Sequence, residues 1–213
     1  MRAKRIGVFG GTFDPIHQGH LHVAKQLCER LQLDEMRMML APQPPHRVQP
    51  QATAAQRWQM LQLALQDSPE LIADDRELRR QGPSYSFDTL SELRIESGPE
   101  ALFVFCLGWD SLVSFPSWHR WRELLDLCVL AVVNRPHHVE GETPLNGELA
   151  RRLIPSADNP VLRLGQIVEI VIVAVPVSAT QVREGLAAGR ELPGNWLAPG
   201  VTQYIKQNQL YGT

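Results

Sequence analysis

Two histidines stand three residues apart, shortly after a pair of glycines, in a pattern suited to binding phosphate. Residues 10–20 read GGTFDPIHQGH and join a short apolar run to a stretch with helical periodicity. Glycines let backbone N–H groups approach a ligand closely, and a helix start offers unpaired N–H groups and the positive end of its dipole. His17 and His20 can face one spot there and stabilise charge that develops on a phosphoryl group.

Each feature of this segment also has a structural interpretation. A Gly-Gly pair after a strand is common in turns, and histidines near a helix start are often structural. The segment fits neither G-x-x-x-x-G-K-[ST] nor G-x-G-x-x-G. Metal ligation is the other chemical alternative, because Asp14, His17, His20 and His22 cluster. However, His22 would point away from His20 on a helix, and Asp14 is the lone carboxylate nearby. We therefore expect anion binding and no metal ligands.

A second candidate phosphate contact is the segment SATQVR at 178–183. Ser178 and Gln181 have the spacing of a capping box, in which side chains satisfy backbone N–H groups at a helix start. Arg183 would lie one turn inside that helix, where a guanidinium can donate paired hydrogen bonds to phosphate oxygens. The capping role and the phosphate role are compatible.

Cations and free backbone N–H groups occur in two further segments. The proline-rich loop 42–50 contains His46 and Arg47, a pair that in isolation would indicate a solvent-exposed turn. Residues 77–89 lead into a helix for which Ser84 or Ser86 is a suitable N-cap. Free N–H groups at that helix start could bind a carboxylate.

Three tryptophans lie within thirteen residues, at 109, 118 and 121. They could simply pack at a sheet edge, which is usual for aromatic residues. One that is exposed where a strand ends would instead give a flat platform for a heteroaromatic ring.

The hydrophobic pattern predicts the elements that must position these groups. Apolar runs rich in β-branched residues alternate with helical patterns, which favours a doubly wound, Rossmann-like α/β fold with a mostly parallel sheet and helices on both faces. Ligands of such folds bind beyond the carboxyl ends of the strands. We expect one domain over residues 1–213. The predicted strands are 5–9, 36–41, 71–73, 102–107, 128–133 and 167–173, and the predicted helices are 19–33, 54–66, 87–96, 120–125, 146–153, 180–188 and 201–207.

Composition narrows the class of protein. Hydrophobic residues make up 44% and charged residues 21% of 213 residues, as in ordinary globular proteins. The net charge of −2 argues against nucleic-acid partners and membrane surfaces. The three cysteines are widely spaced in apolar runs, which predicts buried thiols rather than disulfides or a zinc site. Because the sequence also shows neither a signal-peptide core nor a membrane span, we expect a cytoplasmic protein. It leaves open whether the chain forms a homo-oligomer.

The combined motifs carry more information than their parts. G-G-T-F-D-P-x-H-x-G-H and the 178–183 segment resemble the nucleotidyltransferase superfamily with an H-x-G-H motif. From Gly7 to Tyr211 the chain also resembles the bacterial nicotinate-mononucleotide adenylyltransferases. The motifs that carry this resemblance are PPHR, EL-x-R-x-GPSY-[ST]-x-DT, G-x-D followed by F-P-x-W, Arg135-Pro136 and a Leu-Tyr tail. The resemblance implies transfer of an adenylyl group from ATP to nicotinate mononucleotide by direct in-line attack. Pyrophosphate would leave and nicotinate adenine dinucleotide would form, a step of NAD biosynthesis, with Mg²⁺ carried by the ATP phosphates.

The resemblance also assigns roles to residues. It implies that His17, His20 and Arg183 are catalytic. The residues expected to contact ATP are Gly10, Gly11, Thr12, Phe13, His17, His20, Gly108, Ser178, Thr180 and Arg183. The residues expected to contact nicotinate mononucleotide are His46, Arg47, Tyr85, Ser86, Asp110, Trp118 and Arg135.

Three alternatives remain at this point. A related enzyme could use another acceptor, such as phosphopantetheine, although that family is usually shorter and lacks the GPSY and F-P-x-W segments. Nicotinamide mononucleotide could replace nicotinate mononucleotide. A nucleotide-binding regulatory module could keep the fold without catalysis, but a pure binder does not need the transition-state donors His17, His20 and Arg183.

Overall fold

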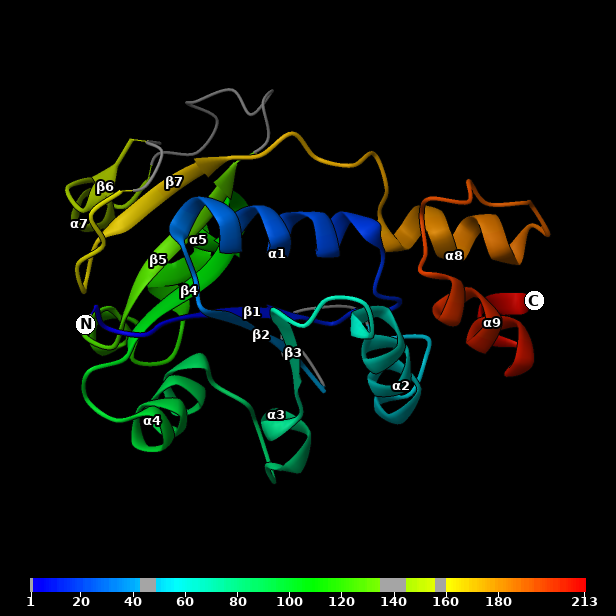
Figure 1. The fold of residues 1–213 in the computed structure, drawn as a ribbon, viewed down its shortest axis with the longest axis horizontal. Helices are drawn as coiled ribbons and strands as arrows, with labels where there is room; N and C mark the ends of the chain where they lie inside the picture. The colour runs from blue at the N-terminus through cyan, green and yellow to red at the C-terminus, as the bar shows by residue number, and fades with distance from the viewer. Residues whose placement is uncertain (1, 43–48, 135–144, 156–159) are drawn as a thin grey trace.

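Seven parallel strands form one sheet in the order β3-β2-β1-β4-β5-β7-β6 (Figure 1). The computed structural model describes residues 2–42, 49–134, 145–155 and 160–213. The order runs outward in both directions from the central pair β1 and β4, so the loops that follow these two strands diverge. The strands are β1 (Arg5–Gly11), β2 (Glu35–Leu40), β3 (Leu71–Asp74), β4 (Leu102–Gly108), β5 (Cys128–Asn134), β6 (Leu153–Ile154) and β7 (Ile167–Val171).

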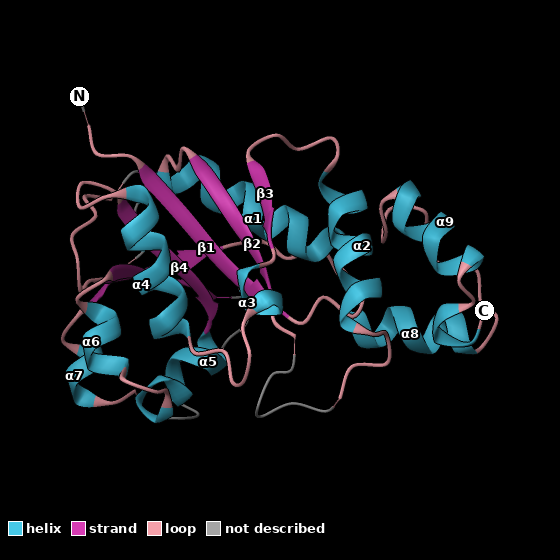
Figure 2. Ribbon diagram, turned by 90° about the horizontal axis from the view of Figure 1, so that it is seen from below, coloured by secondary structure: helices cyan, strands magenta, loops and turns pink. Residues whose placement is uncertain are grey.

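Both faces of the sheet are apolar and covered by helices. In β4, Phe103 and Phe105 belong to one buried cluster, whereas Val104 and Cys106 belong to the other. Alternate residues of a strand point to opposite faces, so such continuous apolar runs are typical of strands buried on both sides. Figure 1 shows α1 above β1 and β2 and α4 below them, and Figure 2 shows α4 in front of the sheet.

Helices pack on both faces of the sheet among the residues that the structure describes. On the first face lie α1 (Gln18–Leu31) and α2 (Ala54–Leu65). Helices α8 (Ala179–Ala187) and α9 (Pro199–Gln207) extend the same buried cluster beyond the end of the sheet (Figure 1). On the second face lie α4 (Ser86–Ser97), α5 (Trp109–Ser114), α6 (Trp121–Leu125) and α7 (Gly147–Ala150). Shorter elements are α3 (Arg76–Arg79) and the 3₁₀ turns η1 (Phe115–Ser117) and η2 (Leu210–Gly212).

The prediction of a parallel sheet with helices on both faces is confirmed, and the differences concern boundaries and short elements. Strand β1 continues two residues beyond Phe9, because Gly10 and Gly11 pair with β2. The predicted helix at 146–153 is shorter, and its last residue, Leu153, belongs to strand β6. Neither α3 nor α5 was predicted, because these two short helices carry too little periodicity and depend on tertiary packing.

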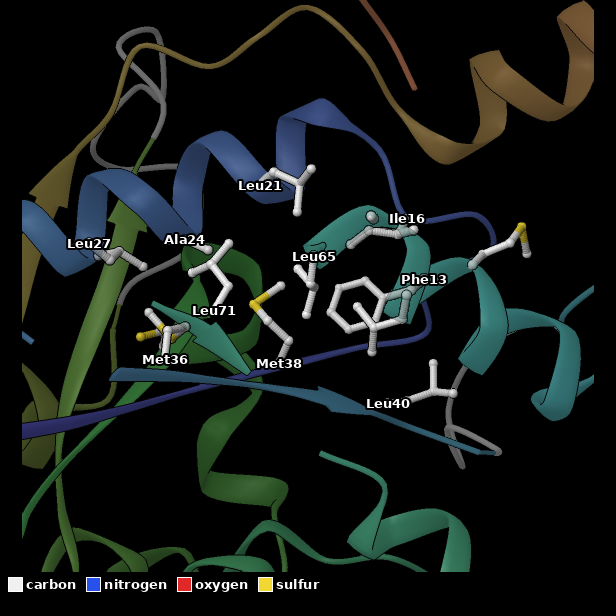
Figure 3. Close-up of a cluster of buried hydrophobic side chains, with 14 of the residues drawn as sticks. Phe13, Ile16, Leu21, Ala24, Leu27, Met36, Met38, Leu40, Leu65 and Leu71 are labelled. Carbon is white, nitrogen blue, oxygen red and sulfur yellow. The ribbon is translucent and has the colours of Figure 1, made fainter. Parts of the chain in front are cut away.

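The ring of Phe13 anchors the loop after β1 in the core. Figure 3 shows Phe13 close to Leu65, Ile16 and Leu40, and its side chain is 2% exposed. The backbone of Phe13 has φ 47°, in the left-handed region that non-glycine residues seldom adopt. Burial of an aromatic ring offsets that strain, so the loop has one fixed path from the sheet to α1.

No helix in the described ranges combines the length and the apolar character needed to cross a bilayer. The three cysteines are free thiols: Cys106 and Cys128 are buried, and Cys28 is half-buried. Burial raises the pKa of all three thiols, so they remain protonated at neutral pH.

Candidate active site

A cleft of about 1330 Å³ opens beyond the carboxyl ends of β1 and β4, where the strand order diverges. Gly10 of β1 and Gly108 of β4 line it. Among the described residues, no atom lies within 4 Å of where a Cβ of either glycine would stand. Open space at both positions lets a ligand approach the backbone directly, which is how glycines serve phosphate-binding loops.

The next glycine is required for a different reason. A Cβ on Gly11 would lie 2.5 Å from the Phe13 ring, which is fixed in the core. Gly11 therefore allows the loop to fold back over this ring, and the backbone of residues 10–13 faces the cleft. Sequence reasoning assigned both glycines to ligand approach, whereas the structure gives Gly11 a packing role as well.

His17 and His20 are stacked at the start of α1. Their ring centroids are 3.7 Å apart with an interplanar angle of 27°. His17 is the N-cap of the helix, and its backbone N–H donates to Nδ1 of His20 over 3.3 Å. An imidazole nitrogen that accepts a hydrogen bond carries no proton, so neutral His20 is protonated at Nε2. His20 lines the cleft, and the Phe13 ring lies edge-on to it at 5.1 Å.

His17 lies behind His20 and is largely shielded from solvent. Its side chain is 7% exposed, and burial lowers its pKa from 6.5 to about 4. His17 is therefore neutral at pH 7. Its Nδ1 has no hydrogen-bond partner among the described residues. A buried polar atom without a partner is uncommon in folded proteins.

Arg183 joins the start of α8 to the loop that follows β1. Its Nη1 donates to the backbone carbonyl of Asp14 at 2.7 Å, and its Nη2 donates to Oγ1 of Thr180 at 3.2 Å. The predicted capping of this helix is confirmed, since Oγ of Ser178 accepts from the backbone N–H of Gln181 at 3.2 Å. Arg183 and Thr180 line the cleft on the side of His20.

Aromatic and polar residues line the remaining part of the cleft. The Trp118 ring packs edge-on against Phe105 at 6.0 Å and is tilted against Phe115 at 5.3 Å. These two phenylalanines fix the plane of an indole that also faces the cleft. The Tyr85 ring lies 4.4 Å from that of His119, so the loop before α4 contacts the segment after η1.

The expected N-cap of α4 was wrong. The helix begins at Ser86 itself, and Tyr85 is the N-cap without a side-chain hydrogen bond. Oγ of Ser84 donates instead to the carbonyl of Glu77 at 3.5 Å, which draws that serine away from the helix start. Tyr85 and Ser86 both line the cleft, so this uncapped helix start faces it with unpaired backbone N–H groups.

The structure brings most of the predicted site residues to one cleft. His17 and Ser178 do not line it, because one ring is covered by His20 and the other side chain caps α8. His46, Arg47 and Arg135 lie outside the described residues. The predicted residues that line the cleft are Gly10, Gly11, Thr12, Phe13, His20, Tyr85, Ser86, Gly108, Asp110, Trp118, Thr180 and Arg183.

Sequence reasoning missed Arg57 of α2. Its side chain is 1% exposed, and its guanidinium donates to four backbone carbonyls, those of Thr12, Ala41, Pro42 and Ala52, over 2.6–3.2 Å. Arg57 thereby ties the loop after β1 to the loop after β2. Its spacing from the buried Met60, Leu61 and Ala64 could have indicated that it faces inward.

A second missed residue, Glu77, lines the cleft from α3. Its carboxylate accepts a hydrogen bond from Oγ1 of Thr89 at 2.8 Å, and burial raises its pKa. An acidic residue in a polar segment is predicted to be solvent-exposed, so the sequence gives no signal that Glu77 is buried.

The acidic and histidine side chains near the phosphate loop are engaged elsewhere. The Asp14 carboxylate accepts hydrogen bonds from the backbone N–H groups of Gln51 and Ala52 and from the hydroxyl of Tyr211. Nε2 of His22 lies 3.0 Å from the carbonyl of Val173. In the described part of the chain, no three His, Cys, Asp or Glu side chains are grouped to hold a metal ion.

Comparison with known proteins relates the chain to nucleotide-transferring enzymes. Residues 8–185 match the family model described as cytidylyltransferase-like. A probable nicotinate-nucleotide adenylyltransferase of Cellvibrio japonicus is 46% identical over 207 residues, which cover 97% of this chain and 98% of that protein. A protein of the same description from Pseudomonas aeruginosa (strain UCBPP-PA14) is 42% identical over 213 residues, covering 98% and 97%.

Solved structures show that the fold is shared. Plasmodium falciparum nicotinic acid mononucleotide adenylyltransferase complexed with NaAD has a TM-score of 0.73 at 18% identity, covering 98% of this chain and 97% of that one. A putative nicotinate-nucleotide adenylyltransferase from Vibrio parahaemolyticus has a TM-score of 0.64 at 15% identity, covering 98% and 96%. With its cytidylyltransferase-like match and relatives above 40% identity along nearly the whole length, the chain belongs to the nicotinate-nucleotide adenylyltransferase family.

Proposed function

We propose that the cleft joins ATP to nicotinate mononucleotide, forming nicotinate adenine dinucleotide and pyrophosphate as a step of NAD biosynthesis. The observation that carries this proposal is that one cleft has two chemically different ends. One end presents backbone N–H, imidazole and guanidinium groups, which suit a triphosphate. The other presents a fixed indole and an uncapped helix start, which suit an aromatic ring bearing a carboxylate. The relatives carry the corresponding name.

The reaction needs no covalent enzyme intermediate. An oxygen of the mononucleotide 5′-phosphate attacks the α-phosphorus of ATP in line and forms the new P–O bond. The bond from the α-phosphorus to the oxygen bridging to the β-phosphorus breaks, and that oxygen leaves with the electron pair as part of pyrophosphate. Catalysis then rests on positioning the two phosphates and stabilising charge as it develops.

The phosphate end supplies the donors. Backbone N–H groups of residues 10–13 and of the start of α8 hold the triphosphate, together with Thr180. His20 donates from Nε2 to a phosphoryl oxygen, and Arg183 donates from its guanidinium. His17 keeps His20 in place by stacking and by its backbone hydrogen bond. His17 and Ser178, which do not line the cleft, remain predicted contacts of ATP.

The other end of the cleft, around Trp118 and the start of α4, binds the mononucleotide. Trp118 stacks on the nicotinate ring, and backbone N–H groups at Tyr85 and Ser86 receive its carboxylate at the uncapped start of α4. Asp110 accepts hydrogen bonds from ribose hydroxyls. His46, Arg47 and Arg135, which lie outside the described residues, remain predicted contacts of the mononucleotide.

The donor set of the phosphate end fits phosphate rather than a metal cation. Mg²⁺ prefers oxygen ligands and keeps several waters, whereas this end offers N–H groups, imidazoles and a guanidinium. The Asp14 carboxylate already accepts three hydrogen bonds. We infer that Mg²⁺ arrives with ATP, held by phosphate oxygens and water with few or no protein ligands. When bound, it offsets the negative charge of the triphosphate.

The test is an acceptor panel. The purified chain is incubated with ATP and Mg²⁺ and, in separate tubes, with nicotinate mononucleotide, nicotinamide mononucleotide or phosphopantetheine. We expect pyrophosphate release and a dinucleotide of the expected mass chiefly in the first tube. Preference for another acceptor would contradict the substrate assignment. Binding of ATP without turnover in any tube would contradict catalysis and favour a regulatory nucleotide-binding module.

A further inference from the structure

Tyr211 of η2 reaches the phosphate loop from the other end of the chain. Its hydroxyl donates to Oδ1 of Asp14 at 2.7 Å, across 197 positions of sequence. The Tyr211 side chain is buried, and η2 contacts both α8 and α9. Figure 1 shows the C-terminus beside α9, at the end of the molecule far from the N-terminus.

Asp14 connects three parts of the site through its carboxylate and its backbone carbonyl. Oδ2 accepts from the backbone N–H of Gln51 at 2.8 Å, and Oδ1 accepts from that of Ala52 at 3.1 Å as well as from Tyr211. The backbone carbonyl of Asp14 accepts from Nη1 of Arg183 at 2.7 Å. Movement of Asp14 therefore shifts the guanidinium that faces the cleft.

The charges around this contact keep the phenol in its donor form. Asp14 is 7% exposed, and the buried Arg57 guanidinium lies close enough to offset its charge. Burial, with the adjacent Asp14 carboxylate, raises the pKa of Tyr211. The hydroxyl thus stays protonated and donates throughout the working pH range of an enzyme assay.

We propose that Tyr211 is a positioning residue for adenylyl transfer, acting through Asp14 on Arg183 and on the loop that leads to α1. The inference rests on the proposed function, because it assigns Arg183 to the triphosphate. Loss of the hydroxyl leaves Oδ1 with only the Ala52 contact and frees the loop to move. Displacement of a positioned group by about 1 Å can lower a rate by about a hundredfold, so even a partial shift is measurable.

The first experiment compares Tyr211→Phe with Tyr204→Phe. Tyr204 lies on α9, is half-buried, and its hydroxyl has no hydrogen-bond partner within the described ranges. We expect Tyr211→Phe to lower kcat/KM by about tenfold and the control to stay within about twofold of the wild type. Urea unfolding of each variant gives its folded fraction, by which rates are corrected. Equal corrected rates for both variants would overturn the proposal.

A double-mutant cycle separates positioning from general stabilisation. Tyr211→Phe is measured again in the Arg183→Ala background, where the guanidinium is absent. If Tyr211 acts through Arg183, the loss of kcat/KM caused by Tyr211→Phe should shrink from about tenfold to about threefold or less. The same factor in both backgrounds would show that Tyr211 only supports the fold, and would overturn the proposal.

A binding measurement keeps this inference distinct from the proposed function. If the wild-type chain fails to turn over, adenylyl transfer is refuted, and the affinity for a non-hydrolysable ATP analogue decides on Tyr211. We expect Tyr211→Phe to weaken that affinity about fivefold relative to wild type and Tyr204→Phe, because the triphosphate donors are displaced. Unchanged affinity in Tyr211→Phe would overturn the positioning role.

Discussion

Burial of His17 makes the stability of the protein depend on pH in a predictable direction. In the unfolded chain its pKa is 6.5, and in the folded protein burial lowers it to about 4. Between these values the unfolded state binds a proton that the folded state does not. The stabilising contribution is therefore fully present above pH 6.5 and is lost as the pH falls toward 4.

The size of the effect follows from the two pKa values. Between pH 7.5 and pH 5, this single residue should lower the free energy of unfolding by about 2 kcal/mol. His17→Asn removes the titrating ring and keeps a good N-cap for α1, since asparagine is among the preferred residues there. The variant should lose about 2 kcal/mol less stability than the wild type over this pH interval.

Urea unfolding at half-unit pH steps, followed by circular dichroism, measures both curves. The same substitution at the half-buried His22 serves as a comparison for the loss of any histidine. Parallel curves for wild type and His17→Asn would refute the reasoning, because they would mean that His17 carries the same charge in both states. A His17→Asn curve that is flatter than that of His22→Asn would support it.

Three further predictions concern residues of the cleft and its support. Arg57→Met leaves four buried or part-buried carbonyls without their donor, so urea unfolding should show a loss of about 3 kcal/mol or more. Arg79→Met, which removes an exposed ion pair, should cost less than about 1 kcal/mol, and equal losses would contradict the role of Arg57. His20→Ala should lower kcat by about a hundredfold or more in a pyrophosphate assay; unchanged turnover of the folded variant would remove it from the mechanism. Trp118→Ala should raise KM for the mononucleotide by about tenfold while KM for ATP stays within about threefold, and an equal rise in both would disprove stacking on the nicotinate ring.

Long elements with a clear period could be predicted from sequence. The alternation of apolar strands with amphipathic helices indicates the parallel sheet, and GGTFDPIHQGH lies where β1 leads into α1. The short helices α3 and α5 escaped prediction because their stability comes from packing rather than from periodicity. The aromatic segment that forms α5 and η1 is an example, since Phe115 has its ring fully buried against the sheet.

The supporting residues of the site were harder to predict than those that face the ligand. Gly10, His20 and Arg183 belong to short motifs, and their chemistry is local. Arg57 and Tyr211 act on backbone or carboxylate groups far along the chain, and only the folded structure shows which groups these are. The shift of the α4 start to Ser86 has a similar cause, because Ser84 is drawn to Glu77 by a tertiary contact.

The most direct test of the central claim is to follow the α-phosphorus of ATP. The wild-type chain is incubated with α-³²P-labelled ATP, Mg²⁺ and nicotinate mononucleotide, then quenched in acid and separated. We expect all transferred label in nicotinate adenine dinucleotide and none on the protein. One labelled dinucleotide should form for each pyrophosphate released. Label that remains on the protein, or that appears as AMP without dinucleotide, would contradict direct adenylyl transfer in this cleft.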